Sequence, residues 1–286
     1  MIEVFGDAAW HIIVDRLPGE ELSSLRLTQR AGGPAATVAM QAALLGAEVT
    51  FSGTLGADDA GNRIARELAL LGVTSGSITR EGKTATVLAE VGSETIRLGV
   101  ELEGVVAPSF DDLPVSPLCY ATGFPPMTPF LERCAEAGLR LIIDVGFQPL
   151  LDQEDAFAEH LTKIGGAVGI GIVSGGDRRA PKRQAVEILL ARGAEAVIVT
   201  LGRAGLVVVQ PGHVQEFPAI EVEERDALCA GDCFVAGLLV GLDRGWGLTD
   251  AVLFGQATAA AKVSRFARLA DKELVAQLLA SRDGAW

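Results

Sequence analysis

Residues 225–237 carry the side chains and spacing best suited to chemistry. Small residues form a turn, Asp232 follows at the expected start of a helix, and an apolar helical run continues behind it. The first amides of a helix lack partners within it and the helix dipole adds positive potential, so this corner suits an anion. An aspartate at its edge can also accept a proton from an attacking hydroxyl, and phosphoryl transfer to an alcohol needs both features. An ordinary helix start, in which Asp232 only favours the dipole, is the alternative for this segment taken alone.

Three other glycine-containing segments are candidate ligand loops. Gly32 and Gly33 lead into an alanine-rich helix, and small side chains let a backbone approach a ligand closely. Tight helix packing is the alternative. The acids of residues 55–61 favour the N-terminus of the next helix, so a structural role is the better interpretation there. Residues 200–205 follow a strand and could lie against phosphates or adenine, with a simple hairpin turn as the alternative.

These segments lie between apolar strands and amphipathic helices that alternate along the chain. Such alternation predicts an α/β fold with a mostly parallel sheet buried on both faces. Right-handed crossovers then place the loops, and the ligand, at the carboxyl ends of the strands. The expected strands are 2–5, 49–53, 141–144, 167–173 and 196–200. The expected helices are 36–45, 61–71, 129–137, 182–191, 234–242 and 249–265.

Two segments, 8–30 and 83–106, break this alternation. The second contains strand-like stretches at 85–91 and 95–100 around a turn at 92–94. The two segments could pair as a small sheet projecting from the main domain. A lid over the ligand and an ordinary surface hairpin both remain open from the pattern alone.

Composition excludes several classes of protein. The 286 residues are 49% hydrophobic, enough for a substantial core, and 24 basic against 37 acidic residues give a formal charge of −13. This charge argues against a nucleic-acid partner. The uncharged stretch 113–131 contains five prolines, which argue against a membrane span. The N-terminus reads as a strand rather than a secretory signal, and the four cysteines show neither a zinc pattern nor a disulfide framework. We therefore expect a cytoplasmic protein.

Taken in order, these motifs resemble the ribokinase-like sugar kinase family, also called the phosphofructokinase-B family, over nearly the whole chain. The motifs that carry the resemblance are Gly32-Gly33 with the following helix, Gly56-x-Asp58-x-x-Gly61, Thr200-Leu201-Gly202-x-x-Gly205 and Asp226-x-x-Cys229-Ala230-Gly231-Asp232. The first two are similar to the N-terminal signature of the family, the third to its nucleotide-binding turn, and the last to its C-terminal signature.

The resemblance implies one kinase domain, 1–286, with a three-layer α/β/α ribokinase-like fold, a mostly parallel central sheet and a small β-sheet lid formed by 8–30 and 83–106. It implies ATP-dependent phosphorylation of a hydroxyl on a sugar or sugar-like molecule, assisted by Mg²⁺. Asp232 would be the general base, and the backbone amides of Cys229, Ala230 and Gly231 the anion hole. The nucleotide would contact Thr200, Gly202, Gly205 and Gln256; the substrate Asp7, His11, Gly32, Gly33 and Thr37; and Asp177 would hold the metal through water.

Departures from the family pattern cluster at the ligand-facing positions. His11 stands where the family usually has an aspartate that grips sugar hydroxyls, and Thr37 stands in place of an asparagine. Both argue against ribose itself, because a site built for one hydroxyl pattern discriminates through such hydrogen bonds. His11 would favour an acidic or phosphorylated substrate if protonated; a packed polar residue is the alternative.

On the nucleotide side, the Asn-x-x-Glu of the family appears as Ser174-Gly175-Gly176-Asp177, and a late-helix asparagine as Gln256. The chain lacks the usual Gly-Ala-containing loop after Arg265, which argues against a monovalent-cation site.

Cys229 replaces a glycine at a position where backbone freedom matters. A thiol at a helix start can have a lowered pKa, and Cys229 and Cys233 lie four residues apart on one helical face. A redox pair is therefore one interpretation, and two small packing residues are the better one.

Two functions remain from the sequence. One is an active kinase for an unusual small substrate, such as a modified sugar, a sugar acid or a nucleoside. The other is a non-catalytic relative that binds a nucleotide or sugar and acts as a sensor or partner. Homodimers formed through the lid sheets are common in the family, so a homodimer is also possible here.

Overall fold

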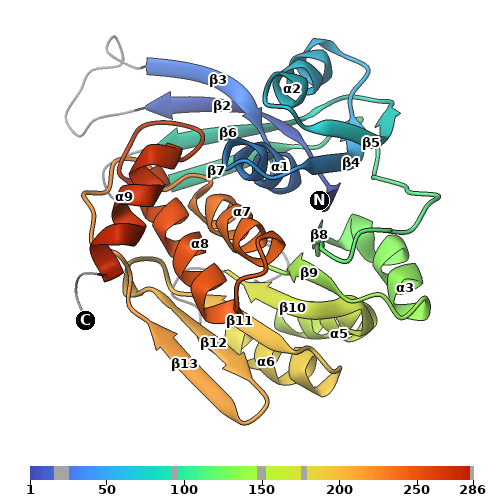
Figure 1. Cartoon of the computed structure of the whole chain (residues 1–286). Helices are drawn as coiled ribbons and strands as arrows, with labels where there is room; N and C mark the ends of the chain where they lie inside the picture. Colours follow the sequence, from blue (N-terminus) through green and yellow to red (C-terminus); the bar gives the residue numbers. More distant parts are fainter. Residues whose placement is uncertain (16–25, 92–95, 147–152, 175–178, 284–286) are drawn as a thin grey trace. The chain divides into compact units, whose positions relative to one another are not determined.

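The computed structural model describes residues 1–15, 26–91, 96–146, 153–174 and 179–283 (Figure 1). The turn expected at 92–94 and the metal candidate Asp177 lie outside these residues. The chain divides into two compact units. The first unit comprises Met1–Pro108 and Glu221–Trp286, and the second comprises Ser109–Ile220.

In the first unit, three parallel strands, β1, β4 and β5, lie side by side with β4 in the middle. Helix α1 packs on β1 and β4, α2 packs on β4 and β5, and α7 packs on both α1 and α8. Helix α7 is apolar almost all round because it is covered on several sides, whereas α2 buries one stripe. The strands are Ile2–Gly6, Val49–Leu55 and Thr74–Arg80; the helices are Pro34–Leu44 (α1), Asp59–Leu70 (α2), Ala230–Asp243 (α7), Leu248–Val263 (α8) and Lys272–Asp283 (α9).

A second, four-stranded sheet of the first unit joins the two segments that break the alternation. Its order is β3-β2-β6-β7, and β2 pairs with β6 in parallel, so the predicted pairing of these segments is observed. Side chains alternate along β2: His11 and Ile13 are buried, and Ile12 and Val14 are half-buried on the other face. The strands are Ala9–Asp15 (β2), Arg26–Gly32 (β3), Ala85–Val91 (β6) and Ile96–Glu101 (β7).

The buried face of this small sheet packs against the turn that precedes α7. Ile13 of β2 and Ala89 of β6 form one apolar cluster with Leu228, and Cys229 packs against it. The sheet is thereby fixed next to the segment that carries Asp232, and side chains on this face of β2 and β3 are placed near that turn.

Asp58 confirms the structural interpretation of residues 55–61. It is the N-cap of α2, and its carboxylate accepts a hydrogen bond from the Gly61 amide at 2.8 Å. The same carboxylate accepts bonds from the Thr84 amide at 2.8 Å and the Thr84 hydroxyl at 2.6 Å. Asp58 therefore ties the start of α2 to the chain entering β6.

In the second unit, six strands follow the order β13-β12-β11-β10-β9-β8. Strands β8 to β11 are parallel, and β12 and β13 are antiparallel additions at one edge. The strands are Cys119–Thr122 (β8), Leu141–Asp144 (β9), Val168–Val173 (β10), Ala196–Thr200 (β11), Leu206–Gln210 (β12) and His213–Phe217 (β13); the helices are Thr128–Glu136 (α3), Glu154–Ile164 (α5) and Arg179–Ala191 (α6).

All the strands and helices expected from the sequence are observed, with ends that differ by a few residues. Within the described ranges, no helix is long and apolar enough to cross a membrane. The uncharged stretch 113–131 instead contains β8, a short 3-10 turn at Pro125–Met127 and the start of α3.

Candidate active site

Asp232 lies in the first turn of α7, as the third residue of a helix that begins at Ala230. Its side chain is partly exposed, and Gly231 beside it is exposed. Both interpretations of the segment require this placement, because a base for an incoming hydroxyl and a carboxylate favouring the dipole occupy the same position.

Cys229 is the N-cap of α7 and adopts a left-handed backbone, with φ 66° and ψ 13°. Among the described residues it is the one non-glycine with a positive φ. A side chain in this conformation costs roughly 1 kcal/mol. The turn thus keeps the geometry that a glycine would give it, at the expense of local strain.

The backbone amides at this turn differ in their bonding. The Ala230 amide donates to the Ala227 carbonyl at 3.1 Å. Within the part of the chain that the structure describes, no backbone acceptor is found for the amides of Cys229 and Gly231. These two amides are the ones best placed to bind an external anion.

The cysteines behave as packing residues. Burial raises the pKa of the Cys229 thiol well above its usual value, and the charge of Asp232 raises it further, so the expectation of a lowered pKa is wrong. Burial, followed by Asp232, raises the pKa of Cys233 to about 12. The Cys233 thiol donates to the Gln41 Oε1 at 3.6 Å, and the same oxygen accepts from the Ala270 amide at 2.7 Å. A thiolate pair is therefore disfavoured at neutral pH.

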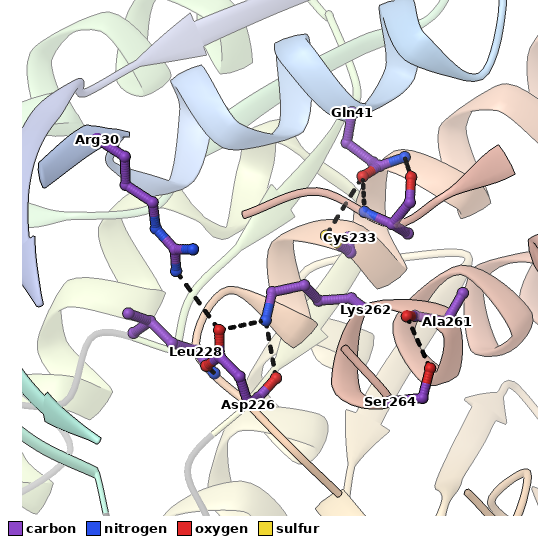
Figure 2. A network of polar contacts seen from close by, with 9 residues as sticks. Arg30, Gln41, Asp226, Leu228, Cys233, Ala261, Lys262 and Ser264 are labelled. Carbon is purple, nitrogen blue, oxygen red and sulfur yellow. Dashed lines mark hydrogen bonds and ion pairs between the residues drawn. The ribbon is translucent and has the colours of Figure 1, made fainter. Parts of the chain in front are cut away.

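A buried ionic network holds the turn in place (Figure 2). The Asp226 carboxylate accepts from the Leu228 amide at 2.9 Å and lies 2.9 Å from the Lys262 ammonium. Lys262 also donates to the Asp226 carbonyl at 2.7 Å, and Arg30 Nη2 lies 3.7 Å from the carboxylate. The amides of Arg225 and Asp226 donate to the Val263 carbonyl at 2.8 and 3.1 Å. Residues 225–228 are therefore fastened to the last turn of α8.

Sequence reasoning missed Lys262 and Arg30. Lys262 is fully buried in an alanine-rich helix, and Arg30 is 8% exposed. The sequence signal that could have found this network is a single lysine within an apolar helical run. A buried ammonium without a counter-ion is strongly destabilising, so such a lysine implies a buried acidic partner. Removing one member of a buried ion pair costs about 3–5 kcal/mol, so this network is a strong constraint on the turn.

His11 of β2 and Gly33 meet directly. The Gly33 amide donates to His11 Nε2 at 3.1 Å. A Cβ at Gly32 would lie 2.3 Å from the His11 ring, and Gly33 has φ 86° and would place a Cβ 2.8 Å from the Ala8 backbone. Both glycines are therefore required by the packing of β2 against the start of α1, which was the alternative to a ligand loop.

His11 is neutral at physiological pH. Burial, and then the charges of Arg30 and Arg268, lower its pKa to about 4. A positively charged His11 is therefore disfavoured near neutrality. Because Nε2 accepts a hydrogen bond, Nδ1 carries the proton and is a donor.

Two other predicted substrate contacts lie near the Gly32-Gly33 turn. Thr37 is fully buried, and its amide donates to the Gly33 carbonyl at 2.9 Å. The Asp7 carbonyl accepts from the Ala36 amide at 3.2 Å, so residue 7 directly adjoins the start of α1. The structure thus brings Asp7, His11, Gly32, Gly33 and Thr37 together around one turn.

The predicted nucleotide contacts fall in both units. Thr200, Gly202 and Gly205 form the connection between β11 and β12 in the second unit, where the Leu201 amide donates to the Gly205 carbonyl at 2.8 Å. This connection joins two antiparallel strands, so it has the hairpin form given as the alternative for residues 200–205. A Cβ at Gly205 would lie 2.0 Å from the Phe217 carbonyl, whereas one at Gly202 would meet nothing within 4 Å. Gln256 lies in α8 of the first unit and is buried.

The metal candidate Asp177 lies outside the described residues, but the chain around it is partly visible. The Gly146 amide donates to Asp144 Oδ1 at 2.8 Å, and a Cβ at Gly146 would lie 2.2 Å from the Ser174 hydroxyl. Burial raises the pKa of Asp144 to about 6, against the effect of the Gly146 amide. Among the residues that the structure describes, no group of three or more His, Cys, Asp or Glu side chains could hold a metal.

The neutral state of His11 predicts how stability depends on pH. The folded pKa of about 4 lies below the unfolded value of 6.5, so on acidification the unfolded state takes up the proton first. Stability is then lost as pH falls through 6.5 and levels off near 4. Between pH 7 and pH 5 the loss due to His11 is about 2 kcal/mol. Urea unfolding of the wild type and of His11→Gln at both pH values measures it, and equal losses in the two proteins would refute it.

Comparison with known proteins places the chain among sugar kinases. The model of the pfkB family of carbohydrate kinases matches residues 1–105 and 169–271. The chain is 31% identical over 278 residues to a fructokinase of Klebsiella pneumoniae, covering 84% of each protein. It is 29% identical over 244 residues to a 1-phosphofructokinase of Haloferax volcanii, covering 80% of this chain and 78% of that protein.

Solved structures show the same fold. A ribokinase from Thermotoga maritima matches with a TM-score of 0.76 at 21% identity, over 98% of this chain and 99% of that one. A fructokinase from Xylella fastidiosa with bound ATP matches with a TM-score of 0.76 at 19% identity, over 99% and 98%. The predicted ribokinase-like α/β fold and the predicted kinase class are therefore confirmed. The chain belongs to the pfkB family of carbohydrate kinases.

Proposed function

We propose that the protein transfers the terminal phosphoryl group of ATP to a hydroxyl of a sugar or sugar-like small molecule. Asp232 accepts the hydroxyl proton as the new O–P bond forms and the bond to ADP breaks. The observation that carries the proposal is the placement of Asp232 in the first turn of α7, directly after the left-handed turn at Cys229.

Backbone amides at the start of α7 stabilise the negative charge on the transferring group. Of the three in the proposed anion hole, those of Cys229 and Gly231 supply most of the stabilisation, because the Ala230 amide already donates to Ala227. The ionic network around Asp226 holds these amides in position, so little reorganisation is needed during the reaction.

ATP is proposed to contact Thr200, Gly202, Gly205 and Gln256. The open space at Gly202 supports this, because a ligand can approach the backbone there. The bound ATP of the Xylella fastidiosa fructokinase is a second support.

Mg²⁺ takes one or two protein carboxylates together with substrate phosphates. The oxygen donors of Asp144 and Ser174, close together where β9 and β10 end, have the chemistry that this ion requires. Asp177 follows Ser174 by three residues, and we propose that it holds the ion through water. When bound, the ion neutralises charge on the phosphates.

Lys262 is proposed to make a monovalent cation unnecessary. Its ammonium already lies between the carboxylate and the carbonyl of Asp226, at 2.9 and 2.7 Å. Carboxylate and carbonyl oxygens are the kinds of group that bind hard cations, and the ammonium already occupies both.

Residues 1–286 are proposed to act as one kinase domain, with the sheet of segments 8–30 and 83–106 as a lid. The packing of Ile13 and Ala89 against Leu228 supports the lid, because it places the sheet next to the turn at Cys229.

The outer face of this sheet exposes Leu27 and Leu88, at 62% and 51%. We propose that a second copy of the chain covers these two leucines in a homodimer, which light scattering tests.

The four free cysteines suit a reducing compartment such as the cytoplasm.

Asp232→Asn is expected to lower turnover by roughly 10²–10⁴-fold, the usual contribution of a general base. The matched control is Asp250→Asn, because Asp250 is an exposed acid in the first turn of α8 and equally the third residue of its helix. ADP release over a panel of sugars, sugar acids and nucleosides measures both variants. Near-normal turnover by Asp232→Asn would contradict the role of Asp232 as general base and leave only its interaction with the helix dipole. ATP binding without transfer to any acceptor would favour the non-catalytic alternative.

Lys262→Ala is expected to lose at least tenfold in turnover, because the buried Asp226 carboxylate is left without its main partner. NH₄⁺ or K⁺ should restore part of this activity, since both fit the space that the ammonium vacates, whereas choline should not. The wild type should turn over equally in Na⁺, K⁺ and choline buffers. Lys163→Ala, which removes an exposed ion pair with Glu159, is the control. Severalfold activation of the wild type by K⁺ would contradict the proposal.

A further inference from the structure

Buried hydrogen-bond donors without acceptors gather around the Gly32-Gly33 turn. They are the Nε and Nη2 groups of Arg30, Nδ1 of His11 and the hydroxyl of Thr37, none of which has a hydrogen-bond partner among the described residues. A buried polar group without a partner costs about 1–3 kcal/mol, and more when it is charged. Several such donors beside one turn indicate an acceptor that is bound there during function.

Arg30 and His11 lie on the same face of the small sheet. They are directly opposite each other in the antiparallel pair of β2 and β3, so their side chains project to the same side. This side also carries Ile13, which packs against Leu228. Arg30 extends from β3 toward the Asp226 turn (Figure 2), which is six residues before Asp232.

Two buried cations, Arg30 and Lys262, face one fully buried carboxylate, that of Asp226. The half-buried Asp7 adjoins the neighbouring Gly32-Gly33 turn. Asp226 is bound by Lys262 at 2.9 Å and lies 3.7 Å from Arg30, which therefore shares an anion that is already paired. A second guanidinium, Arg268, pairs with Glu67. Burial, and then the charge of Arg30, lower the pKa of Arg268 to about 10. Two guanidiniums close enough to repel each other are stabilised when an anion binds beside them.

We propose that Arg30, with His11 Nδ1 and Thr37, forms a subsite for an oxyanion, a carboxylate or a phosphate, on the substrate that the proposed kinase phosphorylates. The guanidinium offers two N–H groups in the fork that matches such an oxyanion. The neutral His11 donates through Nδ1 without adding charge. The acceptor substrate is therefore an anionic sugar derivative, with its oxyanion at Arg30 and its reacting hydroxyl at Asp232.

A neutral sugar satisfies this subsite poorly. Its hydroxyls can accept hydrogen bonds from Arg30, but they bring no negative charge to the guanidinium. A site with a buried charged donor favours a ligand that carries the opposite charge, because hydrogen bonds between ionised groups are stronger than those to a neutral hydroxyl. Arg30 is thus the residue that selects anionic over neutral acceptors.

The test compares glucose, gluconate and glucose 6-phosphate as acceptors for the wild type, Arg30→Gln and Arg30→Lys. We expect one or both anionic acceptors to exceed glucose in kcat/KM by at least tenfold. Arg30→Gln should lower that value about 10- to 100-fold, mainly through KM, as for loss of charge-assisted hydrogen bonds. Arg30→Lys should retain the preference for anions with weaker binding, because it keeps the charge and loses the fork.

The matched control is Arg63→Gln. Arg63 is an exposed residue that stacks on Trp10 of β2, next to His11 but on the opposite face of the strand, so the same charge is removed outside the subsite. Its kcat/KM should change less than twofold. Equal effects of Arg30→Gln and Arg63→Gln would overturn the proposal, as would equal effects of Arg30→Gln on neutral and anionic acceptors.

A binding measurement separates failure of the subsite from failure of the kinase proposal. Titration calorimetry without nucleotide measures gluconate, glucose 6-phosphate and inorganic phosphate binding to the wild type and to Arg30→Gln, with thermal unfolding to verify that both are folded. If the wild type binds an anion and Arg30→Gln does not, the subsite is supported even when no phosphoryl transfer is found. Transfer to glucose that depends on Asp232, without binding of any anion, supports the kinase and overturns the subsite. Binding of only one anion class identifies the oxyanion.

Discussion

The contact between Asp226 and Lys262 is the constraint on which the candidate active site depends. A fully buried ammonium bonds both the carboxylate and the carbonyl of Asp226, and the carboxylate in turn accepts the Leu228 amide. Helix α8 supplies Lys262 and also the Val263 carbonyl, which accepts from the Arg225 and Asp226 amides. The entry to α7 therefore cannot shift without breaking several buried polar contacts. Such breaks are costly because each leaves a polar or charged group unpaired in the interior. The position of Asp232 follows from this anchoring.

The anchoring also explains how Cys229 keeps a left-handed conformation that a side chain disfavours. The strain of roughly 1 kcal/mol is small beside the cost of breaking the buried ion pair. The thiol adds contacts with the apolar cluster of Ile13, Ala89 and Leu228, which a glycine lacks. Two sets of contacts therefore fix the turn: the ionic network of Asp226 and Lys262, and the apolar cluster with the small sheet. Amides held in this way are oriented before an anion arrives, which is the condition for electrostatic stabilisation in phosphoryl transfer.

The sequence predicted those parts of the molecule that local rules decide. Apolar periodicity located most of the buried strands and helices, although not the buried strand β8 or helix α5. Asp58 and Asp232 were placed correctly at helix starts. Strand β5 was missed because most of its side chains are exposed and give no apolar pattern. The roles of Arg30 and Lys262 were missed because both depend on the Asp226 carboxylate, which lies about 200 residues along the chain from Arg30 and 36 from Lys262. The protonation of His11 was equally beyond the sequence, since burial and the charges of Arg30 and Arg268 decide it.

Two of the departures from the family pattern, His11 and Thr37, lie with Arg30 around the Gly32-Gly33 turn. Where the family pattern has an aspartate, which accepts hydrogen bonds from a sugar, this chain has His11, whose free nitrogen donates. Thr37 adds a buried hydroxyl at the same turn. Arg30 adds a buried guanidinium whose Nε and Nη2 make no hydrogen bond, with Nη2 3.7 Å from the Asp226 carboxylate. The change to His11 replaces an acceptor with a donor, whereas the Thr37 hydroxyl can donate or accept. A degraded site would lose polar groups or pair them internally, because buried unpaired donors are destabilising. Buried donors at Arg30 and His11 are instead what recognition of an anionic ligand requires, so they favour the proposed altered specificity over loss of function.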